Sequence, residues 1–324
     1  MRLAADIMKI TQNHCHGLAL AAVLPFGTLL HEPAPAKEIY KHSPQGDLQL
    51  FCFKSAATTN PSRPTPAVLW IHGGGWTGGT CESFFPMARY TAARGAASFV
   101  AQYRLVRPGG PTVADSVADC QDAVRYLRLH AGHLGIDPQR IVLIGESAGG
   151  HLAACVGLAN EVGDPKDEAN VSARPDALIL YNPLTDFTES SFFKTILDGP
   201  GNAADKLRIA RELSPIFHVR SGLPPTLMVH GLADTVIYPE QSRRFAAAMK
   251  QAGNRCDLVL LSDTPHAFLI PEYKCSEAVV VDALRLGDKF LTALGYLSGE
   301  PTLTVDDPPA WAGKWPPNAA PQFH

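Results

Sequence analysis

The stretch that decides the fold runs from residue 141 to residue 150 and reads IVLIGESAGG. Its first four residues are β-branched or leucine, as in a buried strand, and the apolar residues after Gly150 are typical of a buried helix. Between them, Gly-Glu-Ser-Ala-Gly at 145–149 matches the G-x-S-x-G pattern of a nucleophile elbow, a sharp strand-to-helix turn. Ser147 is therefore a candidate nucleophile at one edge of an α/β sheet.

The two outer glycines of this motif have a steric explanation. The turn is so sharp that a side chain at Gly145 or Gly149 would strike the neighbouring strand or helix. The helix that follows also directs its dipole at the Ser147 hydroxyl, which favours negative charge on the oxygen. The alternative is a glycine-rich turn with an ordinary N-capping serine, and the other motifs decide between the two.

A second glycine motif, His-Gly-Gly-Gly-Trp at residues 72–76, follows another short apolar run. Acyl transfer needs backbone N–H groups aimed at the developing oxyanion, and glycines let the backbone approach that oxygen. We expect these donors to be Gly73 or Gly74, together with Ala148 after the nucleophile. The loop lacks the Lys-Ser/Thr ending of a phosphate-binding P-loop, and we expect His72 to anchor it.

Two further polar residues complete a catalytic triad in the chain order Ser, Asp, His. Asp234 lies in His-Gly-Leu-Ala-Asp-Thr-Val at 230–236, and His266 follows the next apolar run. His266 would take the Ser147 proton and return it to the leaving alcohol, while Asp234 would hold the imidazole tautomer and stabilise its cation. Asp263 is a rival acid, but it fits better as the end of a strand. We expect the remaining titratable residues of these motifs to pack or anchor loops: Glu146, His151 and His230.

The chain between these motifs alternates short apolar runs with helical periods. A hairpin is expected at 39–41 and 48–53, and buried strands at 68–71, 98–103, 141–144, 177–181, 226–229 and 258–261. Helices are expected at 117–127, 148–159, 239–251 and 277–294, the first of them ended by Gly135 and Asp137-Pro138. The alternation predicts an α/β fold with a mostly parallel central sheet and helices on both faces. The ligand then binds at the carboxyl ends of the strands, where every motif lies.

The ends of the chain and two insertions depart from this alternation. Residues 1–36 hold an apolar stretch and Ala34-Pro35-Ala36 before Lys37, which predicts a cleaved leader and a secreted or periplasmic protein. The alternative is a cytoplasmic protein with a packed or disordered N-terminal arm. We expect a catalytic domain over 37–297 and an extended or disordered proline-rich tail over 298–324. The polar segments 160–174 and 185–220 are expected to be irregular and to form a small cap insertion.

The overall composition narrows the class of partner. A chain of 324 residues that is 46% hydrophobic can bury one large core, and a net charge of −3 with scattered Lys and Arg gives no basic surface for nucleic acid. After leader removal no other segment would cross a membrane. The seven cysteines show no metal or redox spacing, and His14-Cys15-His16 matches no common metal site, so most cysteines should be core residues. We expect a small ester substrate and no metal or organic cofactor; the sequence leaves the oligomeric state open.

These motifs together resemble the hormone-sensitive-lipase-like esterases of the α/β-hydrolase fold. Within that group, Trp76, Gly-Ile-Asp-Pro at 135–138 and Ser-Pro-Ile at 214–216 are most similar to bacterial acetyl and feruloyl esterases that deacylate plant polysaccharides. The resemblance spans residues 39–294 and implies a carboxylic-ester hydrolase acting on short-chain esters, such as acetyl or aryl esters of carbohydrates. Leu232-Ala233 departs from the family, which usually has a more polar pair there.

The substrate pocket is predicted less sharply than the triad. Five residues of the glycine loop or of the segment after a core strand are candidate pocket walls, although each could equally be ordinary packing: Trp76, Tyr181, Asn182, Phe187 and Phe192. A peptidase or amidase with the same triad is one alternative function, although no propeller or amine-binding Glu pair precedes the domain. A non-catalytic hydrolase-like receptor is another, although such proteins usually lack the nucleophile or the base.

Overall fold

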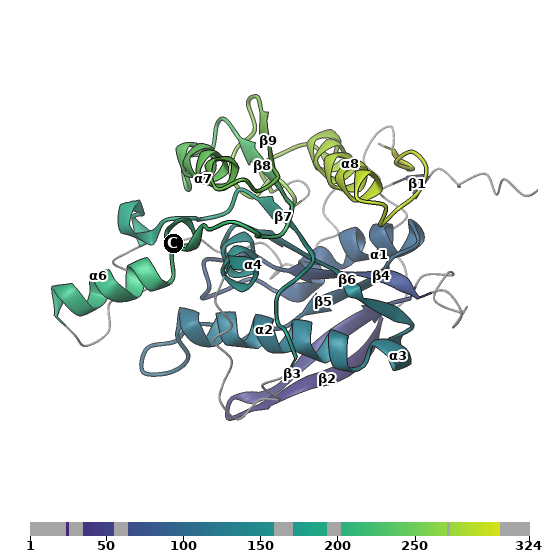
Figure 1. Cartoon of the computed structure of the whole chain (residues 1–324), viewed down its shortest axis with the longest axis horizontal. Helices are drawn as coiled ribbons and strands as arrows, with labels where there is room; N and C mark the ends of the chain where they lie inside the picture. The colour runs from purple at the N-terminus through teal and green to yellow at the C-terminus, as the bar shows by residue number, and fades with distance from the viewer. Residues whose placement is uncertain are drawn as a thin grey trace, which may run out of the picture.

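An eight-stranded sheet forms the centre of the molecule (Figure 1). Its strand order is β2-β3-β5-β4-β6-β7-β8-β9. β3 pairs antiparallel with β2 and β5, and all pairs from β5 through β9 are parallel. The predicted mostly parallel sheet is confirmed, with these strands: β2 (Ala36–Ser43), β3 (Gly46–Phe53), β4 (Thr65–Ile71), β5 (Ala97–Ala101), β6 (Ile136–Glu146), β7 (Ala177–Tyr181), β8 (Thr226–Gly231) and β9 (Cys256–Leu261).

The computed structural model describes six ranges of the chain: 24–25, 35–54, 64–158, 171–192, 202–270 and 273–304. The His14-Cys15-His16 triplet, most of the predicted leader, residues 160–170 of the first insertion and residues 305–324 of the tail lie outside them. Of the helices within these ranges, none combines the length and the apolar composition that a membrane crossing requires.

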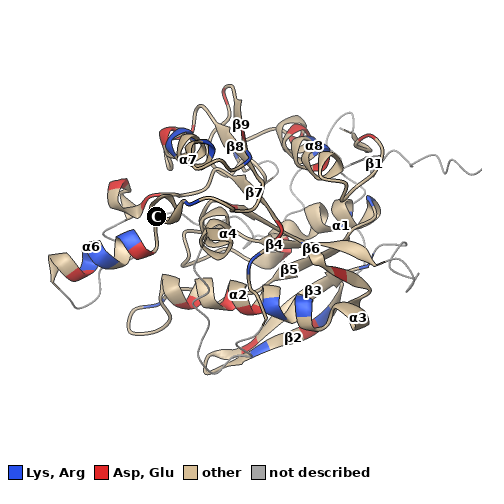
Figure 2. Ribbon diagram, viewed as in Figure 1, with Lys and Arg blue, Asp and Glu red and all other residues tan. Residues whose placement is uncertain are grey.

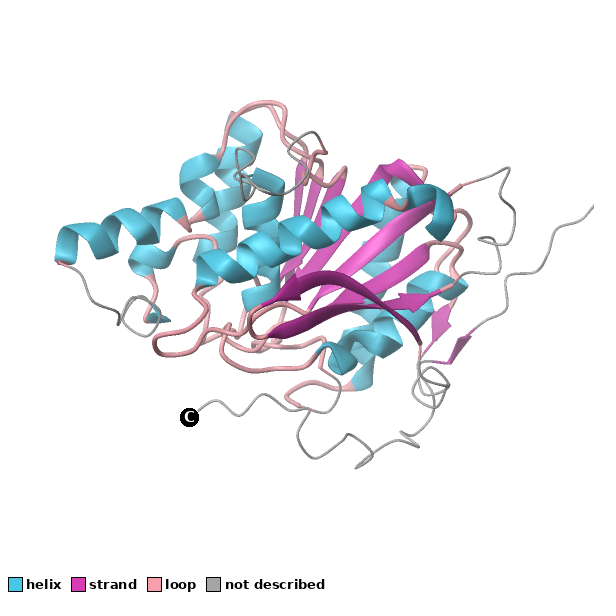
Figure 3. Cartoon of the chain, turned by 90° about the horizontal axis from the view of Figure 1, so that it is seen from below, coloured by secondary structure: helices cyan, strands magenta, loops and turns pink. Residues whose placement is uncertain are grey.

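Helices cover both faces of the sheet (Figure 3). α1 (Phe85–Ala93) and α8 (Glu277–Ala293) pack on one face, in an apolar cluster with Trp70 of β4. The other face is covered by α2 (Val113–Leu129), α4 (Ala148–Leu158) and α7 (Glu240–Gln251), in a second cluster with Leu69. Every residue of β4 and β7 is buried, because each strand lies between two layers of helices.

The chain between α2 and the elbow differs from the prediction. α2 ends at Leu129, and a short helix, α3 (Ala131–Leu134), ends at Gly135 in a left-handed conformation with φ 68°. Asp137 and Pro138 already belong to β6 instead of turning the chain. The register between β4 and β6 is irregular at this point, which lets a proline enter the strand. In the hairpin, residues 44–45 form the turn and Gly46 begins β3.

The second insertion contains a regular helix, so the prediction of an irregular segment was wrong. It includes η4 (Phe187–Glu189), α6 (Ala203–Glu212) and η5 (Pro215–His218). The Asn202 side chain caps α6 by accepting a hydrogen bond from the Asp205 N–H, at 3.0 Å. α6 extends away from the sheet, and only its Ala210 is buried, so its sequence has the polarity of a loop (Figures 1 and 3).

The two ends of the described chain meet. β1 (Leu24–Pro25), within the predicted leader, pairs with β10 (Leu303–Thr304), within the predicted tail. Arg94 forms a buried ion pair with Asp288 and also donates to the carbonyls of Ser298 and Gly299. The first residues of the tail are therefore fixed against the domain.

Charge and cysteine placement are ordinary for a globular enzyme. Figure 2 shows both signs of charge on α2, α6, α7 and α8. The described cysteines are unpaired, and most are buried, as predicted: Cys52, Cys81, Cys120, Cys155 and Cys256, with Cys275 partly exposed.

Candidate active site

The nucleophile elbow has the geometry that its sequence predicts. Ser147 lies between the end of β6 and the start of α4 and has a φ of 55°, in the left-handed region. A Cβ at Gly145 would lie 2.2 Å from the Gly149 carbonyl oxygen, and one at Gly149 would lie 2.1 Å from that of Ile71. Since such contacts are too short for any side chain, only glycine fits at either position.

The structure brings Ser147, Asp234 and His266 into one hydrogen-bonded chain. Ser147 Oγ lies 2.8 Å from His266 Nε2, and His266 Nδ1 lies 2.7 Å from Asp234 Oδ2. A carboxylate can only accept, so Nδ1 carries the proton and Nε2 keeps its lone pair for the serine hydroxyl. The imidazole is therefore in the tautomer that a general base for Ser147 requires.

Asp234 is held as a carboxylate by four donors. Its Oδ1 accepts from the N–H groups of Val236 and Ile237, both at 2.9 Å, and its Oδ2 accepts from His266 and His230. Burial by itself raises the pKa of this carboxyl, but the hydrogen bonds from the two histidines outweigh it and hold the pKa well below its usual value. Asp263, the rival acid, is exposed in the turn after β9.

His230 has a closer connection to the triad than its predicted loop-anchoring role implied. Its buried ring contacts Asp234 Oδ2 at 3.1 Å and the Ile237 carbonyl at 2.8 Å through Nε2, and Ser242 Oγ at 2.7 Å through Nδ1. The residue thus anchors the triad acid itself. The spacing of four residues between His230 and Asp234 was visible in the sequence, but nothing in it showed that the two side chains meet.

The glycine loop lies against the nucleophile. A Cβ at Gly73 would be 3.0 Å from the Glu146 carbonyl and 3.3 Å from Ser147 Cβ. Gly74 has a φ of 119°, and its carbonyl accepts from the Gly78 N–H at 2.9 Å. Ala148 is the first residue of α4, where an N–H has no carbonyl one turn earlier to bind. Gly73 and Ala148 thus lie directly beside Ser147, and Gly74 continues the same loop.

His72 anchors this loop, as expected. Its Nδ1–H donates to the Gly73 carbonyl at 2.7 Å, and Tyr103 both stacks on the ring and donates its hydroxyl to the His72 carbonyl at 2.9 Å. Burial lowers the pKa of His72 to about 4, so the ring is neutral at pH 7.

Glu146 connects the elbow to the loop that carries the base. Its Oε1 accepts from the Leu269 N–H at 2.9 Å, three residues after His266. Among the described residues its Oε2 has no partner. Burial raises the pKa of Glu146 to about 8, which favours the neutral carboxyl near pH 7, and the residue links the two segments.

One predicted pocket wall, Tyr181, is a core residue, and another, Asn182, lies beside the triad base. Tyr181 packs beneath α8, where its hydroxyl donates to the Ala283 carbonyl at 3.1 Å, so it is a core residue. The side chains of a strand alternate between the two faces of the sheet, and that of Tyr181 points away from the site. The Asn182 amide lies 3.4 Å from His266 Nδ1. Because Nδ1 donates to Asp234, it has no lone pair for the Asn182 amide, so the two groups are packed neighbours rather than hydrogen-bond partners.

The other three predicted wall residues form one aromatic cluster. The Trp76 ring lies 5.1 Å from the ring of Phe187 and 5.7 Å from that of Phe192, and His151 packs edge-on against Trp76 and Phe187. Trp76 and Phe187 are each 1% exposed. The cluster joins the glycine loop, α4 and the second insertion.

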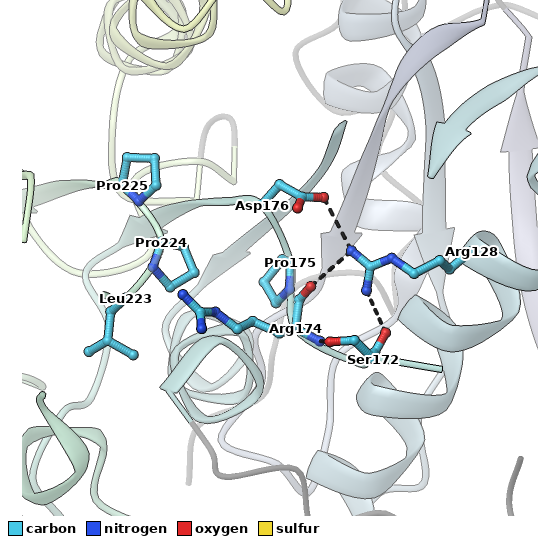
Figure 4. Close-up of a pocket in the computed structure, with 8 residues that line it drawn as sticks. All are labelled: Arg128, Ser172, Arg174, Pro175, Asp176, Leu223, Pro224 and Pro225. Atoms are coloured by element: carbon cyan, nitrogen blue, oxygen red, sulfur yellow. Dashed lines mark hydrogen bonds and ion pairs between the residues drawn. The ribbon is translucent and has the colours of Figure 1, made fainter. Parts of the chain in front are cut away.

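A separate pocket lies at the opposite edge of the sheet (Figure 4). The residues that line it lie near the starts of β7 and β8, with Asp176 just before β7 and Pro225 just before β8. Arg128 donates there to the carbonyls of Ser172 and Arg174 and to Asp176 (Figure 4). Within the described ranges, no three His, Cys, Asp or Glu side chains are grouped as metal ligands.

A nucleophilic serine, its histidine base and a buried carboxylate at the carboxyl edge of a mostly parallel sheet define a serine hydrolase of the α/β-hydrolase fold. The chain belongs to the BD-FAE family, whose model matches residues 56–249.

Solved structures of an esterase are similar to the chain over most of its length. Thermogutta terrifontis esterase 2 in its apo form is 36% identical, with a TM-score of 0.75, and the match covers 83% of this chain and 97% of that one. The propionate-bound form and the form phosphorylated by paraoxon match at 35% identity with TM-scores of 0.74. The predicted fold and the resemblance to esterases are confirmed.

Relatives by sequence are also ester hydrolases. Carboxylesterase NlhH of Mycobacterium tuberculosis is 31% identical over 60% of this chain and 63% of its own length. A probable isoprenylcysteine alpha-carbonyl methylesterase of Oryza sativa is 28% identical over 70% of this chain. The match spans only 56% of that methylesterase.

Proposed function

We propose that the chain hydrolyses carboxylic esters with short acyl groups through an acyl-enzyme on Ser147. The observation that carries this proposal is the 2.8 Å contact between Ser147 Oγ and His266 Nε2, with Asp234 bonded to the other ring nitrogen. This is the arrangement that an activated serine nucleophile requires.

The residues perform the reaction in two steps. His266 Nε2 removes the Ser147 proton as Oγ attacks the ester carbonyl, and N–H groups of the glycine loop and of Ala148 stabilise the oxyanion. The C–O bond to the alcohol then breaks, and the alcohol leaves with the proton from His266. Water, deprotonated by the same nitrogen, attacks the acyl-enzyme, releases the acid and restores Ser147.

A short acyl group on a carbohydrate alcohol is the substrate class we favour. The aromatic cluster of Trp76, Phe187 and Phe192 beside the glycine loop supports a small acyl site. Thermogutta terrifontis esterase 2 has been solved with propionate bound and with butyrate bound. The carbohydrate portion is supported by the similarity of the motifs to acetyl and feruloyl esterases.

A substrate panel tests this proposal. Acetyl, butyryl and octanoyl esters of p-nitrophenol, acetylated and feruloylated oligosaccharides and an aminoacyl anilide would be compared by kcat/KM. We expect acetyl and butyryl esters to exceed octanoyl by at least about tenfold, since each ill-fitting methylene changes pocket binding measurably. Anilide turnover far above ester turnover would assign the site to a peptidase or amidase instead.

Export through a cleaved leader is a separate proposal, supported by the apolar stretch and Ala34-Pro35-Ala36. Cleavage before Lys37 would remove β1, the partner of β10. N-terminal sequencing of protein recovered outside the cytoplasm would test it, and an intact N-terminus with all of the protein in the cytoplasm would contradict it.

A further inference from the structure

His151 lies one helical turn after the nucleophile, and the proposed reaction does not use it. Its side chain is fully buried on α4. Nδ1 lies 3.1 Å from the Trp76 indole nitrogen, and Nε2 lies 2.7 Å from the carbonyl oxygen of Leu213. The ring therefore bridges the glycine loop and the second insertion, which are separate segments of the chain.

The two partners fix the state of the ring. An indole N–H can only donate and a carbonyl oxygen can only accept, so Nδ1 accepts from Trp76 and Nε2–H donates to Leu213. Burial lowers the pKa of His151 to about 4, and the neutral ring keeps both bonds at pH 7. Cys155 Sγ, 3.3 Å from Nε2, lies beside the second bond, and burial raises the pKa of its thiol, so it stays uncharged.

On the loop side, Trp76 controls the backbone near the oxyanion donors. It stands two residues after Gly74 and has a φ of 63°, a left-handed conformation that a tryptophan adopts only where its surroundings impose it. Its carbonyl accepts from the Val106 N–H at 2.9 Å. The hydrogen bond to His151 fixes the indole, and with it the end of the glycine loop.

On the cap side, the same short segment holds two contacts. Leu213 follows the last residue of α6, and Ser214 Oγ accepts from the Phe187 N–H at 2.8 Å while donating to the Ala210 carbonyl at 2.6 Å. Residues 213–214 at the end of α6 thus accept hydrogen bonds from both His151 and Phe187, and Phe187 packs on Trp76.

We infer that His151 is a positioning residue that couples the cap to the oxyanion loop: by holding the Trp76 indole, it sets where the N–H groups of Gly73 and Gly74 point. This inference rests on the proposed function, which assigns those groups to ester hydrolysis. Because the oxyanion forms only in the transition state, the coupling acts on kcat more than on KM.

Three single variants and one double variant, His151→Leu with Trp76→Phe, test this role with an acetyl ester as substrate. His151→Leu removes both bonds and should lower kcat by about tenfold or more, with KM within about threefold of wild type. The expected loss of kcat is smaller than that caused by removing an oxyanion donor outright, because the donors stay in place but are less well oriented. His151→Gln restores one acceptor and one donor and should recover most of kcat. Trp76→Phe removes only the loop-side donor and should lower kcat as much as His151→Leu does. The kcat of the double variant should be no lower than that of the poorer single variant, because both changes break the same link.

His218→Leu is the matched control. His218 lies in the same insertion and donates to the Glu212 carbonyl at 2.8 Å, but it is only half-buried and, among the described residues, has no hydrogen bond or ring contact with Trp76. It should keep the kinetics of the wild type. Thermal unfolding of each variant shows whether it is folded; if His151→Leu is not, Trp76→Phe and His151→Gln decide.

The outcomes are distinguishable. Wild-type kcat in Trp76→Phe, or a loss confined to KM in the folded variants, would overturn the positioning role while leaving the proposed function intact. A wild-type protein that turns over no ester would overturn both proposals.

Discussion

The two edges of the sheet each carry a hydrogen-bonded carboxylate, but they differ in what that carboxylate connects to. At the carboxyl edge, the Asp234 side chain is 0% exposed and its bonds continue through His266 to a serine hydroxyl. At the amino edge, the Asp176 side chain is 31% exposed and accepts from Arg128 and from the Ile141 N–H (Figure 4).

The difference shows that a cavity and a charge pair do not by themselves make a site. At the amino edge, the Arg128 guanidinium donates only to backbone carbonyls and to Asp176, so its role is to hold neighbouring segments of the chain in place. At the carboxyl edge the chain of donors and acceptors ends on the Ser147 hydroxyl, which can lose its proton to His266 Nε2. Matched substitutions at the two edges should therefore have very different effects on catalysis.

The largest effect is expected from removing the nucleophile. Ser147→Ala should lower kcat by about 10⁶, because the triad acts as a unit. Ser172→Ala, at the amino edge, removes a hydroxyl that accepts from the Arg174 N–H and should leave kcat unchanged within about twofold. Steady-state hydrolysis of an acetyl ester measures both, and comparable activity in Ser147→Ala would refute the mechanism.

The two carboxylates give the next contrast. Asp234→Asn should lower kcat by about 10⁴, because an amide no longer selects the imidazole tautomer that serves Ser147. Asp176→Asn should lower the melting temperature with little change in kcat, since its partners are structural. Equal losses of kcat in the two variants would show that the comparison between the edges is wrong.

The raised pKa of Glu146 should make the stability of the fold depend on pH. Its pKa is raised from 4.5 to about 8 in the fold, so between these values the unfolded chain loses a proton that the native chain keeps, and stability falls as pH rises. Glu146→Gln has no carboxyl to titrate, so its unfolding free energy should not fall in this way. The unfolding free energy of Glu146→Gln relative to wild type should therefore rise by roughly 2–3 kcal/mol from pH 5.5 to 7.5.

Urea unfolding at several pH values measures this difference. Glu240→Gln, which removes an exposed carboxylate on α7, is the control and should show no such trend. A constant difference between Glu146→Gln and wild type across this range would mean that Glu146 is ionised in the fold.

The smallest effect is expected from Arg174→Ala in the amino-edge pocket. The guanidinium bonds to the Gly222 carbonyl at the surface, so its loss should change unfolding free energy by about 1 kcal/mol or less and kcat by less than about twofold. A tenfold fall in kcat would show that the pocket in Figure 4 takes part in the reaction.

Much of the fold could be predicted because its signals are local. Apolar runs, helical periods and glycine turns each lie within a few residues, and the expected core strands match β4 to β9. α6 was missed because most of its residues are polar or charged and only Ala210 is buried, so the polarity of the segment outweighed its helical period. Tyr181 was misplaced because both faces of β7 are apolar, so the sequence gives no sign of which face points to the site.

By itself, the sequence singled out Ser147, Asp234 and His266 as a set, because each sits in a short motif and the motifs follow one another in the order that the α/β-hydrolase sheet requires. Only the tertiary structure decided which other residues support them. His151 meets residues 75 and 62 positions away, and Glu146 meets one 123 positions away. Contacts of that range depend on how strands and insertions pack, which no local pattern records.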